Sequence, residues 1–439
     1  MRISDLENKK IVIWGVGREG RAAAGFIRRR FPDQKFTFID ENPCVDADFL
    51  AAGDRVLHEA AQIADALNAA DVIIKSPGVS LYHPLLRDKK PTSLLNLWLA
   101  EPHAAKILCV TGTKGKSTTA ALLAHVLQAL GHKAALLGNI GVPVTEFDAR
   151  ERGYAIVEIS SYQAANLTET CDIGIVTSLF PEHLDWHKSL QAYYRDKLNV
   201  LAHSRIGIIN ADAKATVKGD GIDRDAAVLF NDASGFHVKD GVIYEKNSPL
   251  GLPPNAYLSR AHNLMNVCAA LAVLRQVGIE PQDALPKMAS FRALPHRQQE
   301  LGVIGGILFV NDSISTTPQS AIAAMEAYPD RAVTLLIGGQ DRGIDYAPLI
   351  DYVQQKNTRA VICMGASGRR IYEQLKAPNV FLAASLADAV ALAREKTPAG
   401  GVVLLSPAAP SYDMFHNFEE RGDLFAKLAR QEKDISCPR

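Results

Sequence analysis

Val110-Thr-Gly-Thr-Lys-Gly-Lys-Ser-Thr-Thr119 is the stretch of sequence that decides the fold. The apolar residues 107–110 predict a buried strand, and the apolar run from Thr119 to Leu130 predicts a helix. Gly112 and Gly115 let the backbone turn, so that its N–H groups converge on an anion at the positive end of that helix. The sequence therefore predicts a phosphate-binding loop between a strand and a helix.

The side chains of this loop suit a bound nucleotide. Lys116 adds a compact positive charge, and Ser117 or Thr118 offers a hydroxyl to a metal ion. The usual pattern has a glycine where Val110 stands, so an ordinary glycine turn is the alternative.

Composition limits the possible classes of protein. The 439 residues allow two to four domains, and 47% of them are hydrophobic. Lys+Arg and Asp+Glu both number 48, and this balance argues against a nucleic-acid binder that relies on a broad basic field. We find neither an apolar run of membrane-spanning length nor the apolar core of a signal peptide. The scattered cysteines indicate reduced core residues of a cytoplasmic protein: Cys44, Cys109, Cys171, Cys268, Cys363 and Cys437.

The N-terminal segment resembles a dinucleotide-binding unit. We expect a strand at residues 11–14, a glycine loop at residues 15–20, a helix at residues 21–30 and a strand at residues 35–39 that ends at Asp40. A further strand at 71–75 leads into Ser76, Pro77 and Gly78, and the alternation of strands and helices predicts a parallel sheet.

The remaining chain repeats this alternation of strands and helices in two further segments. The expected strands of the middle segment are 107–110, 154–159, 173–179 and 206–210, followed by a small antiparallel insertion within 212–258 and a helix at 263–277. Those of the last segment are 307–310, 332–337, 360–364 and 401–405. We predict three α/β domains, at 1–99, 100–293 and 294–439, with a linker at 293–297.

Polar groups follow the strands of the middle segment. Glu158 stands at the end of a strand near the phosphate loop, where a carboxylate is suited to hold magnesium. His183 follows the next strand with Asp185 as a possible orienting partner, although a structural histidine is an equal alternative. Lys197 reads as an ordinary helix lysine, and Asn266 as either a surface residue or an adenine or ribose contact.

The last segment has polar loops after three strands, at 311–318, 338–343 and 406–411. Loops at the carboxyl ends of neighbouring parallel strands make a substrate-binding edge, and Arg342 could bind a carboxylate bidentately. The residues alone leave three functions open: an ATP-dependent ligase or kinase around Lys116, a nicotinamide-dependent oxidoreductase around the glycine loop, and a non-catalytic nucleotide switch.

Taken together, the motifs resemble the Mur ligase family over essentially the whole chain. The motifs are Thr111 to Thr118, Glu158-Ile-Ser-Ser-Tyr-Gln, Glu182-His-Leu-Asp, His262-Asn-Leu-Met-Asn, Pro295-His-Arg and Asn311-Asp-Ser, in that order. The resemblance implies a Rossmann-like UDP-binding domain, a central P-loop ATPase domain with a parallel sheet, and a C-terminal Rossmann-like domain for the amino acid. It also accounts for Val110, because the family's loop is shortened.

The resemblance also implies roles for individual residues. Those for catalysis are Lys116, His183 and Lys197. Those for ATP are Gly112, Thr113, Lys114, Gly115, Lys116, Ser117, Thr118, Asn266, Arg297 and Asp312. Those for the UDP-muramoyl substrate are Gly15, Val16, Gly17, Arg18, Asp40, Ser76, Pro77, Gly78, Asn139, Ser160, Gln163 and His183. Those for glutamate are Thr316, Arg342, Ser411 and Phe418. Those for magnesium are Ser117, Glu158, His183 and Lys197, with Lys197 carbamylated.

Within the family, the chain looks like the members that add glutamate to UDP-N-acetylmuramoyl-L-alanine for peptidoglycan synthesis. Enzymes that use D-glutamate read Asp-Ser-Lys-Ala-Thr where this chain reads Asp312-Ser-Ile-Ser-Thr316. Ile314 therefore replaces a cation, and the surrounding run is similar to the branch that uses L-glutamate. We expect L-glutamate, with D-glutamate as the alternative. The resemblance further implies ATP, two magnesium ions and a cytoplasmic monomer that acts on small molecules and binds no nucleic acid.

Overall fold

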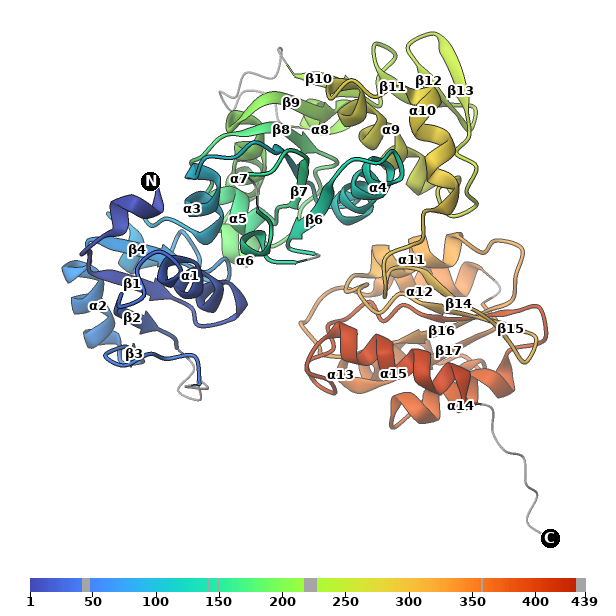
Figure 1. The fold of residues 1–439 in the computed structure, drawn as a ribbon. Helices are drawn as coiled ribbons and strands as arrows, with labels where there is room; N and C mark the ends of the chain where they lie inside the picture. The colour runs from blue at the N-terminus through green and yellow to red at the C-terminus, as the bar shows by residue number, and fades with distance from the viewer. Residues whose placement is uncertain (42–47, 141, 149, 217–226, 357, 432–439) are drawn as a thin grey trace. The chain divides into compact units, whose positions relative to one another are not determined.

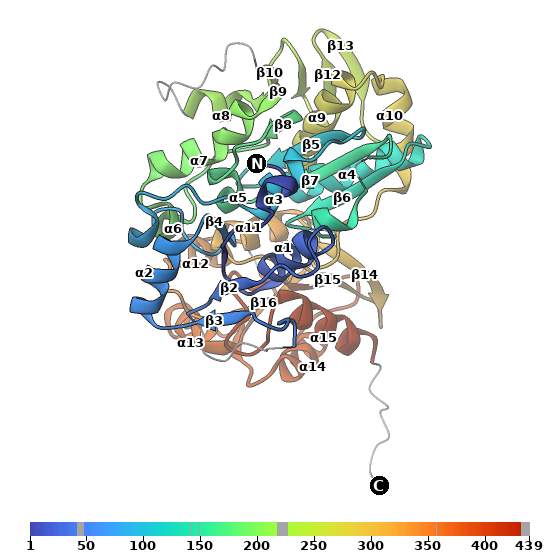
Figure 2. The ribbon, with the colours of Figure 1, turned by 60° about the vertical axis from the view of Figure 1, so that its left-hand side comes forward.

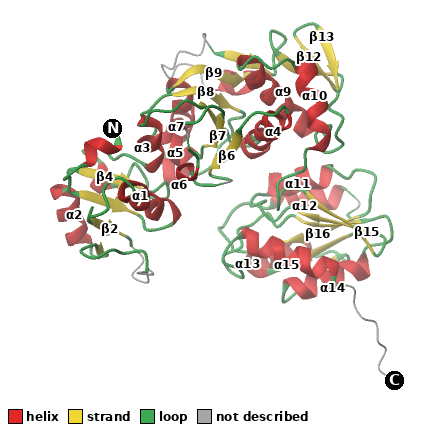
Figure 3. Cartoon of the chain, viewed as in Figure 1, coloured by secondary structure: helices red, strands yellow, loops and turns green. Residues whose placement is uncertain are grey.

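The structure is a computed structural model that describes residues 1–41, 48–140, 142–148, 150–216, 227–356 and 358–431. It divides into two compact units, Met1–Phe291 and Arg292–Arg439, and each is described by itself. The first unit contains two sheets and the second contains one (Figures 1 and 3). The predicted three-domain α/β class is confirmed, whereas the boundaries at 99/100 and 293/294 stay predictions.

The first sheet is parallel, with the strand order β3-β2-β1-β4. Its strands are β1 (Ile11–Trp14), β2 (Phe36–Ile39), β3 (Arg55–Leu57) and β4 (Val72–Lys75). Its helical segments are η1 (Ile3–Leu6), α1 (Arg18–Arg28), α2 (Ala60–Ala69) and η2 (Pro84–Leu86). Strands β1 and β4 are wholly buried because α1 packs on one face of the sheet and α2 on the other.

Helix α3 (Leu94–Ala100) connects the two sheets of the first unit (Figure 2). Six of its seven residues are buried. Leu95, Leu97 and Leu99 belong to an apolar cluster that also contains Ile13 of the first sheet and Ile107 of the second. The two sheets of this unit therefore share one continuous core.

The second sheet has nine strands in the order β13-β12-β11-β10-β9-β8-β5-β7-β6. They are β5 (Lys106–Thr111), β6 (Ala134–Gly138), β7 (Tyr154–Glu158), β8 (Cys171–Val176), β9 (Ser204–Asn210), β10 (Val228–Phe230), β11 (Phe236–Lys239), β12 (Val242–Glu245) and β13 (Ser248–Gly251). The helical segments are α4 (Lys116–Ala129), η3 (Val144–Glu146), α5 (Ser161–Ala165), α6 (Leu184–His187), α7 (Leu190–Ala202), α8 (Ala211–Thr216), α9 (Ala261–Gln276), α10 (Pro281–Lys287) and η4 (Met288–Ser290).

The predicted antiparallel insertion is only partly correct. Strands β11, β12 and β13 pair antiparallel, but β10 pairs parallel with β9 and the four strands extend the edge of the central sheet. The difference arises because β10 pairs with β9 and runs in the same direction as the parallel strands of the central sheet. The antiparallel pairing begins only between β11 and β12. Residues 217–226 of the insertion lie outside the described residues.

The second unit has one six-stranded sheet in the order β14-β15-β19-β16-β17-β18, parallel except for β14. Its strands are β14 (Gln299–Ile304), β15 (Ile307–Asn311), β16 (Val333–Ile337), β17 (Ala360–Cys363), β18 (Val380–Leu382) and β19 (Val402–Leu405). Helices α11 (Pro318–Glu326), α12 (Ala347–Gln355), α13 (Gly365–Leu375), α14 (Leu386–Lys396) and α15 (Phe418–Arg430) cover both faces.

Membrane-spanning helices and disulfides are both absent from the part of the chain that the structure describes. In the part of the chain that is described, no helix has both the length and the apolar character needed to cross a bilayer. Cys109, Cys171, Cys268 and Cys363 are buried and form no disulfide with one another, as expected of reduced core cysteines. Cys44 and Cys437 lie outside the described residues.

Candidate active site

The predicted phosphate loop lies between β5 and α4. Gly112 has φ +148° and Gly115 has φ +83°, both in the region that favours glycine. A Cβ atom would also collide with Thr177 Oγ1 at Gly112 and with Asn266 Oδ1 at Gly115. Helix α4 starts at Lys116, three residues before the prediction, so the N–H groups of its first turn point into this loop.

The loop that follows β8 in the same sheet supports the phosphate loop from the side. The expected strand 173–179 ends at Val176, and the hydroxyl of the next residue, Thr177, donates to the Lys114 carbonyl at 2.6 Å. Thr113 N donates to the Ser178 carbonyl at 2.9 Å, and Lys114 N to the Ser178 hydroxyl at 2.8 Å. These bonds fix the loop before any ligand binds.

A cavity of about 220 Å³ adjoins the phosphate loop within the first unit. Its lining residues come from loops after the strands of both sheets and from helices α1, α4, α5 and α7: Glu19, Pro77, Lys116, Asn139, Ser160, Ser161, Tyr162, Gln163, Glu182, His183 and Lys197. Seven of these were singled out from the sequence, so the fold brings together residues that lie more than a hundred positions apart.

Glu158 ends β7 beside this cavity and is 1% exposed. Its Oε1 accepts a hydrogen bond from Asn139 Nδ2 at 2.9 Å, whereas its buried Oε2 has no hydrogen-bond partner among the described residues. A buried carboxylate oxygen without a partner is costly unless a cation or a ligand completes it.

Lys197 lies on α7, 2% exposed, and its Nζ donates to the Gly112 carbonyl at 2.7 Å. The amine also lies 5.3 Å above the centre of the Tyr193 ring. Burial lowers the pKa of Lys197 well below the usual range, and the charge of Lys116 lowers it further. This lysine is therefore neither exposed nor ordinary, which the sequence alone did not reveal.

His183 has φ +55° and ψ 37°, an uncommon conformation for histidine, and it caps the start of α6. Its ring lies 5.2 Å from the ring of Tyr162, and its Nε2 lies 3.7 Å from Glu182 Oε2. Partial removal from water lowers the pKa of His183, and Lys197 and Lys116 act in the same direction against Glu182. The carboxylate beside His183 is thus Glu182, and the proposed partner Asp185 is exposed.

The Glu182 carboxylate carries the charge opposite to that of the lysines around the cavity. Burial alone would raise its pKa, but the charges of Lys114, His183, Lys116 and Lys197 together lower it. Lys114 Nζ lies 3.5 Å from Glu182 Oε1. Lys114 and Lys116 thus bring positive charge to the phosphate-loop side of the site, which suits anionic phosphate and carboxylate groups.

Protein carboxylates, imidazoles and thiols do not form a ready-made metal cage in this unit. Among the described residues, no three His, Cys, Asp or Glu side chains lie close enough together to hold a metal ion by themselves. A magnesium site here would need other donors, such as the Ser117 hydroxyl and a carbamate on Lys197.

The glycine loop of the first sheet is closed by short polar contacts. Gly15 has φ +95°, and its carbonyl accepts a hydrogen bond from the Ser76 hydroxyl at 2.9 Å. Val16 N donates to Asp40 Oδ2 at 3.0 Å, so the predicted acid organises the loop. Helix α1 starts at Arg18, close behind Gly17.

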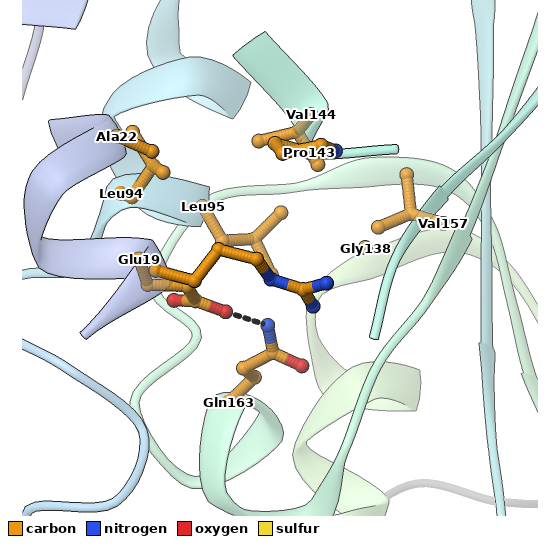
Figure 4. A pocket seen from close by; sticks show the side chains of 10 residues that line it. Glu19, Ala22, Leu94, Leu95, Gly138, Pro143, Val144, Val157 and Gln163 are labelled. Carbon is orange, nitrogen blue, oxygen red and sulfur yellow. Dashed lines mark hydrogen bonds between the residues drawn. The ribbon is translucent and has the colours of Figure 1, made fainter. Parts of the chain in front are cut away.

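A second, smaller pocket lies beside α1 and α3 (Figure 4). In it the Gln163 amide donates to the Glu19 carboxylate at 2.5 Å, which joins α5 to α1. Burial raises the pKa of Glu19, and burial lowers the pKa of the neighbouring Lys75 to about 8. The predicted substrate residue Gln163 is thus held in place by the first sheet's helix.

In the second unit, the three polar loops meet at one sheet edge as predicted, because β15, β19 and β16 are neighbours. Asp312 is buried and accepts from Ser315 Oγ at 2.5 Å and Ser406 Oγ at 2.7 Å. Burial raises its pKa to about 6. Of the predicted glutamate residues, Ser411 is buried, Thr316 and Phe418 are half-buried, and Arg342 is exposed.

The two other ATP residues implied by the resemblance lie apart in the chain. Asn266 on α9 donates to Asn263 Oδ1 at 3.0 Å and faces Gly115, as the close approach of its Oδ1 shows. Arg297 is half-buried at the start of the second unit.

Sequence reasoning missed two buried charged groups. Arg421 is 1% exposed, and it donates through Nη2 to the Ser313 and Ala409 carbonyls at 2.7 and 3.1 Å. Burial lowers its pKa to about 10. Asp196 forms a hydrogen bond with His187 at 2.6 Å, and neither side chain stood out in the sequence. The available signal was a second histidine four positions after His183.

Comparison with known proteins agrees with this geometry. Residues 110–274 match the model of the Mur ligase middle domain, and residues 296–409 match that of the Mur ligase glutamate ligase domain. The UDP-N-acetylmuramoyl-L-alanine–L-glutamate ligase of Xanthomonas euvesicatoria pv. vesicatoria is 40% identical over 456 aligned positions, which cover 98% of this chain and 97% of the relative. The enzyme of that description from Salinispora tropica is 41% identical over 451 positions, with 98% and 99% covered.

Solved structures share the fold at low sequence identity. The UDP-N-acetylmuramate-alanine ligase of Thermotoga maritima has a TM-score of 0.60 at 17% identity, with 96% of this chain and 99% of that chain covered. The MurF ligase of the same organism, solved with ADP, has a TM-score of 0.58 at 14% identity, with 96% of both chains covered. The chain therefore belongs to the Mur ligase family of ATP-dependent ligases.

Proposed function

We propose that this ligase joins L-glutamate to UDP-N-acetylmuramoyl-L-alanine, with hydrolysis of ATP to ADP and phosphate, in peptidoglycan precursor synthesis. The observation that carries the proposal is the cavity in which Lys116 of the phosphate loop meets Asn139, His183 and Lys197. The relatives named for this reaction at about 40% identity over the whole chain support the choice of substrates. Membership of the family sets the oxidoreductase alternative aside.

In the first step, the alanyl carboxylate attacks the γ-phosphate of ATP and ADP leaves, which gives an acyl phosphate. Repulsion between the anions is the main obstacle, so the N–H groups at the start of α4 and the Lys116 ammonium would stabilise the charge of the transferred group. The bonds that hold the loop through Thr177 and Ser178 support this step, because a rigid set of donors need not reorganise.

In the second step, the neutral amine of glutamate attacks the acyl carbon. The tetrahedral intermediate collapses to the amide, and phosphate leaves. The amine must lose a proton, and the lowered pKa of His183 favours a neutral imidazole. That imidazole has two mutually exclusive roles: it accepts this proton, or it binds magnesium. The loops that carry Thr316 and Ser411 form the sheet edge that we assign to the glutamate.

The residues fit a magnesium site. Glu158 Oε2 is a buried oxygen without a partner among the described residues, and Ser117 and His183 complete the set that the family resemblance implies. Lys197 would join them after its amine forms a bond to the carbon of CO₂ and releases a proton, which leaves a carboxylate-like ligand. Magnesium, when bound, would offset the negative charge of the phosphates.

Two features favour carbamylation of Lys197. Its amine is 2% exposed beside the charge of Lys116, so the neutral form that reacts with CO₂ is favoured over an ammonium. A carbamate at the same position would replace an unfavourable buried cation by an anion, which Lys114, Lys116 and a metal ion would stabilise.

The choice of L-glutamate rests on the loop after β15. Ile314 stands where D-glutamate enzymes of the family have a lysine, and its half-buried side chain offers no charge to a dicarboxylate. Other contacts of the loop must then orient the amino acid. This difference from the D-glutamate enzymes supports a glutamate of the opposite configuration.

The test is an assay of the purified protein with ATP, magnesium, UDP-N-acetylmuramoyl-L-alanine and either enantiomer of glutamate. We expect phosphate release coupled to amide formation, with L-glutamate giving at least about tenfold higher kcat/KM than D-glutamate, a difference of about 1.4 kcal/mol. A preference for D-glutamate would overturn the stereochemical part alone. Absence of any coupled product would overturn the whole proposal.

A further inference from the structure

A buried chain of hydrogen bonds runs behind the cavity in the first unit. His187 Nδ1 lies 2.6 Å from Asp196 Oδ2, and His187 Nε2 lies 3.0 Å from Ser161 Oγ. The Tyr82 hydroxyl donates to both oxygens of Asp196 at 2.8 Å. His187 is fully buried, and Ser161 and Asp196 are 3% and 5% exposed, so water does not compete for the two bonds of His187. Tyr82 is half-buried, and its hydroxyl also accepts from Arg195 Nη2 at 2.9 Å.

The direction of the bonds follows from the carboxylate. Asp196 can only accept, so His187 carries its proton on Nδ1, and its Nε2 accepts the Ser161 hydroxyl. Each polar atom of the imidazole thus has one partner. The ring is further enclosed by aromatic side chains, with the Trp186 ring at 4.5 Å and the Tyr193 ring at 5.1 Å, so it has a single orientation.

The members of this chain stand next to the candidate magnesium ligands in sequence. Ser161 starts α5, three residues after Glu158, and His187 ends α6, one turn after His183. Asp196 precedes Lys197 on α7. The two nitrogens of His187 therefore tie α6 to α7, which carries Lys197, and to α5, which follows the strand that ends at Glu158.

The fourth member comes from the first sheet. Tyr82 belongs to the loop after β4, which also carries the candidate substrate residues Ser76, Pro77 and Gly78. The same loop contacts α6 directly, because Ser80 Oγ donates to the Trp186 carbonyl at 3.0 Å and Trp186 Nε1 donates to the Gly78 carbonyl at 3.2 Å. The chain thus extends from the substrate loop to the ligand-bearing elements.

We propose that His187 is a positioning residue that, through Asp196, Ser161 and Tyr82, fixes the separation of Glu158, His183 and Lys197 and links the magnesium site to the substrate loop. The inference rests on the proposed magnesium site and goes beyond it, because none of the four residues is a candidate ligand. Partners that orient the ligands of a metal ion typically change its affinity about 10–100-fold when they are removed.

The order Ser161–His187–Asp196 is also that of a nucleophilic triad. Such a triad needs a serine that meets the substrate and an imidazole that can move a proton to it. Here the imidazole is fully buried and the carboxylate is shared with Tyr82, so the geometry points to positioning. A nucleophilic role predicts an acyl ester on Ser161, which the experiment below detects.

The experiment titrates Mn²⁺, in place of Mg²⁺, into the full chain with bound UDP-N-acetylmuramoyl-L-alanine and follows free Mn²⁺ by electron paramagnetic resonance. His187→Asn keeps a donor toward Asp196 but removes the acceptor for Ser161, and Tyr82→Phe removes one hydroxyl while its ring remains beside Trp186. We expect His187→Asn to raise the Kd for Mn²⁺ about tenfold and Tyr82→Phe to raise it about threefold.

Tyr194→Phe is the matched control, because it removes a tyrosine hydroxyl from a buried residue of α7 that is not a member of the chain of bonds. It should change the Kd less than about twofold. If His187→Asn and Tyr82→Phe lower the melting temperature but leave the Kd for Mn²⁺ within about twofold of wild type, the residues are only structural and the inference is overturned.

Two further measurements separate this inference from the proposals beneath it. Glu158→Gln should weaken Mn²⁺ binding strongly, and an unchanged Kd in that variant would overturn the metal site and the inference with it. Coupled phosphate release by the wild-type protein tests the reaction independently of the metal titration. A mass increase on the peptide that contains Ser161, after incubation with ATP and muramoyl substrate, would overturn positioning in favour of a nucleophile.

Discussion

Lys197 is the residue whose environment differs most from what its place on a helix suggests. A buried amine 2.7 Å from a carbonyl and close to Lys116 is unfavourable as an ammonium, and the proposed carbamate would remove that cost. Nothing in the spacing of α7 distinguishes this lysine from a surface residue. Only the fold, which turns that face of the helix toward the phosphate loop, identifies it.

Lys197→Ala should lose nearly all ligase activity and recover a substantial part of it when short carboxylic acids such as acetate are added. The added carboxylate would occupy the space of the carbamate and supply the missing oxygen ligand. Phosphate release measured against acetate concentration checks this. Lys116→Ala is the control, because its loss removes a cation, and acetate should not restore it. Equal responses in the two variants would return Lys197 to a structural role.

Asp312 should give the second unit a stability that depends on pH. Burial raises the pKa of this carboxyl from 3.8 to about 6, so between these values the folded protein holds a proton that the unfolded chain releases. The contribution of Asp312 to stability is therefore greatest below about pH 4, declines as the pH rises to about 6, and stays low above it.

Asp312→Asn removes this titration. The free energy of unfolding of the variant minus that of wild type should increase by roughly 2–3 kcal/mol as the pH rises from about 4 to 6.5. Urea unfolding followed by circular dichroism at several pH values measures the difference, and the common background of other groups cancels. Parallel pH curves for the two proteins would show that folding does not raise the pKa of Asp312.

At the scale of elements, the strand–loop–helix units were readable from the sequence because their signals are local. Apolar runs marked β1, β5 and β15, and glycines marked the loops where a Cβ atom has no room. The parallel pairing of β10 was not readable, since it depends on which edge strand is free. The buried pair of His187 and Asp196 was equally hidden, because their contact joins two helices whose packing no local pattern encodes.

Helix α1 offers a direct test of the close approach between strand and helix in the first sheet. A Cβ atom on Gly20 would collide with the Gly15 carbonyl, whereas one on Gly25 of the same helix meets nothing within 4 Å. Gly20→Ala should therefore lower the free energy of unfolding by about 2 kcal/mol or more, because the backbone of the glycine loop must move.

Gly25→Ala should instead raise stability by about 0.5–1 kcal/mol, since alanine restricts the unfolded chain and the site is exposed. Chemical unfolding of the two variants beside wild type gives both values. Similar losses in both variants would mean that α1 does not approach the loop as described, and the binding loop of the first sheet would need a different account.

At the scale of the whole molecule, the two compact units have separate apolar cores. The clusters around β16 and β19 draw only on residues of the second unit, and the cluster shared through α3 draws only on the first. The candidate ligands Ser117, Glu158, His183 and Lys197 all belong to the first unit, whereas Asp312 and the proposed glutamate residues belong to the second. The first unit alone should therefore bind the metal ion, whereas catalysis should need both units.

Fragments 1–291 and 292–439, produced separately, should each unfold in one cooperative transition, because each contains the partners of its own core. Fragment 1–291 should bind Mn²⁺ with a Kd within about threefold of the full chain, since no candidate ligand is lost. Neither fragment should form the amide alone, because the phosphate loop belongs to the first unit, whereas the residues proposed for glutamate belong to the second. If fragment 1–291 folds but binds Mn²⁺ more than about tenfold more weakly, the metal site must include residues of the second unit, and the assignment of ligands to Ser117, Glu158, His183 and Lys197 would be incomplete.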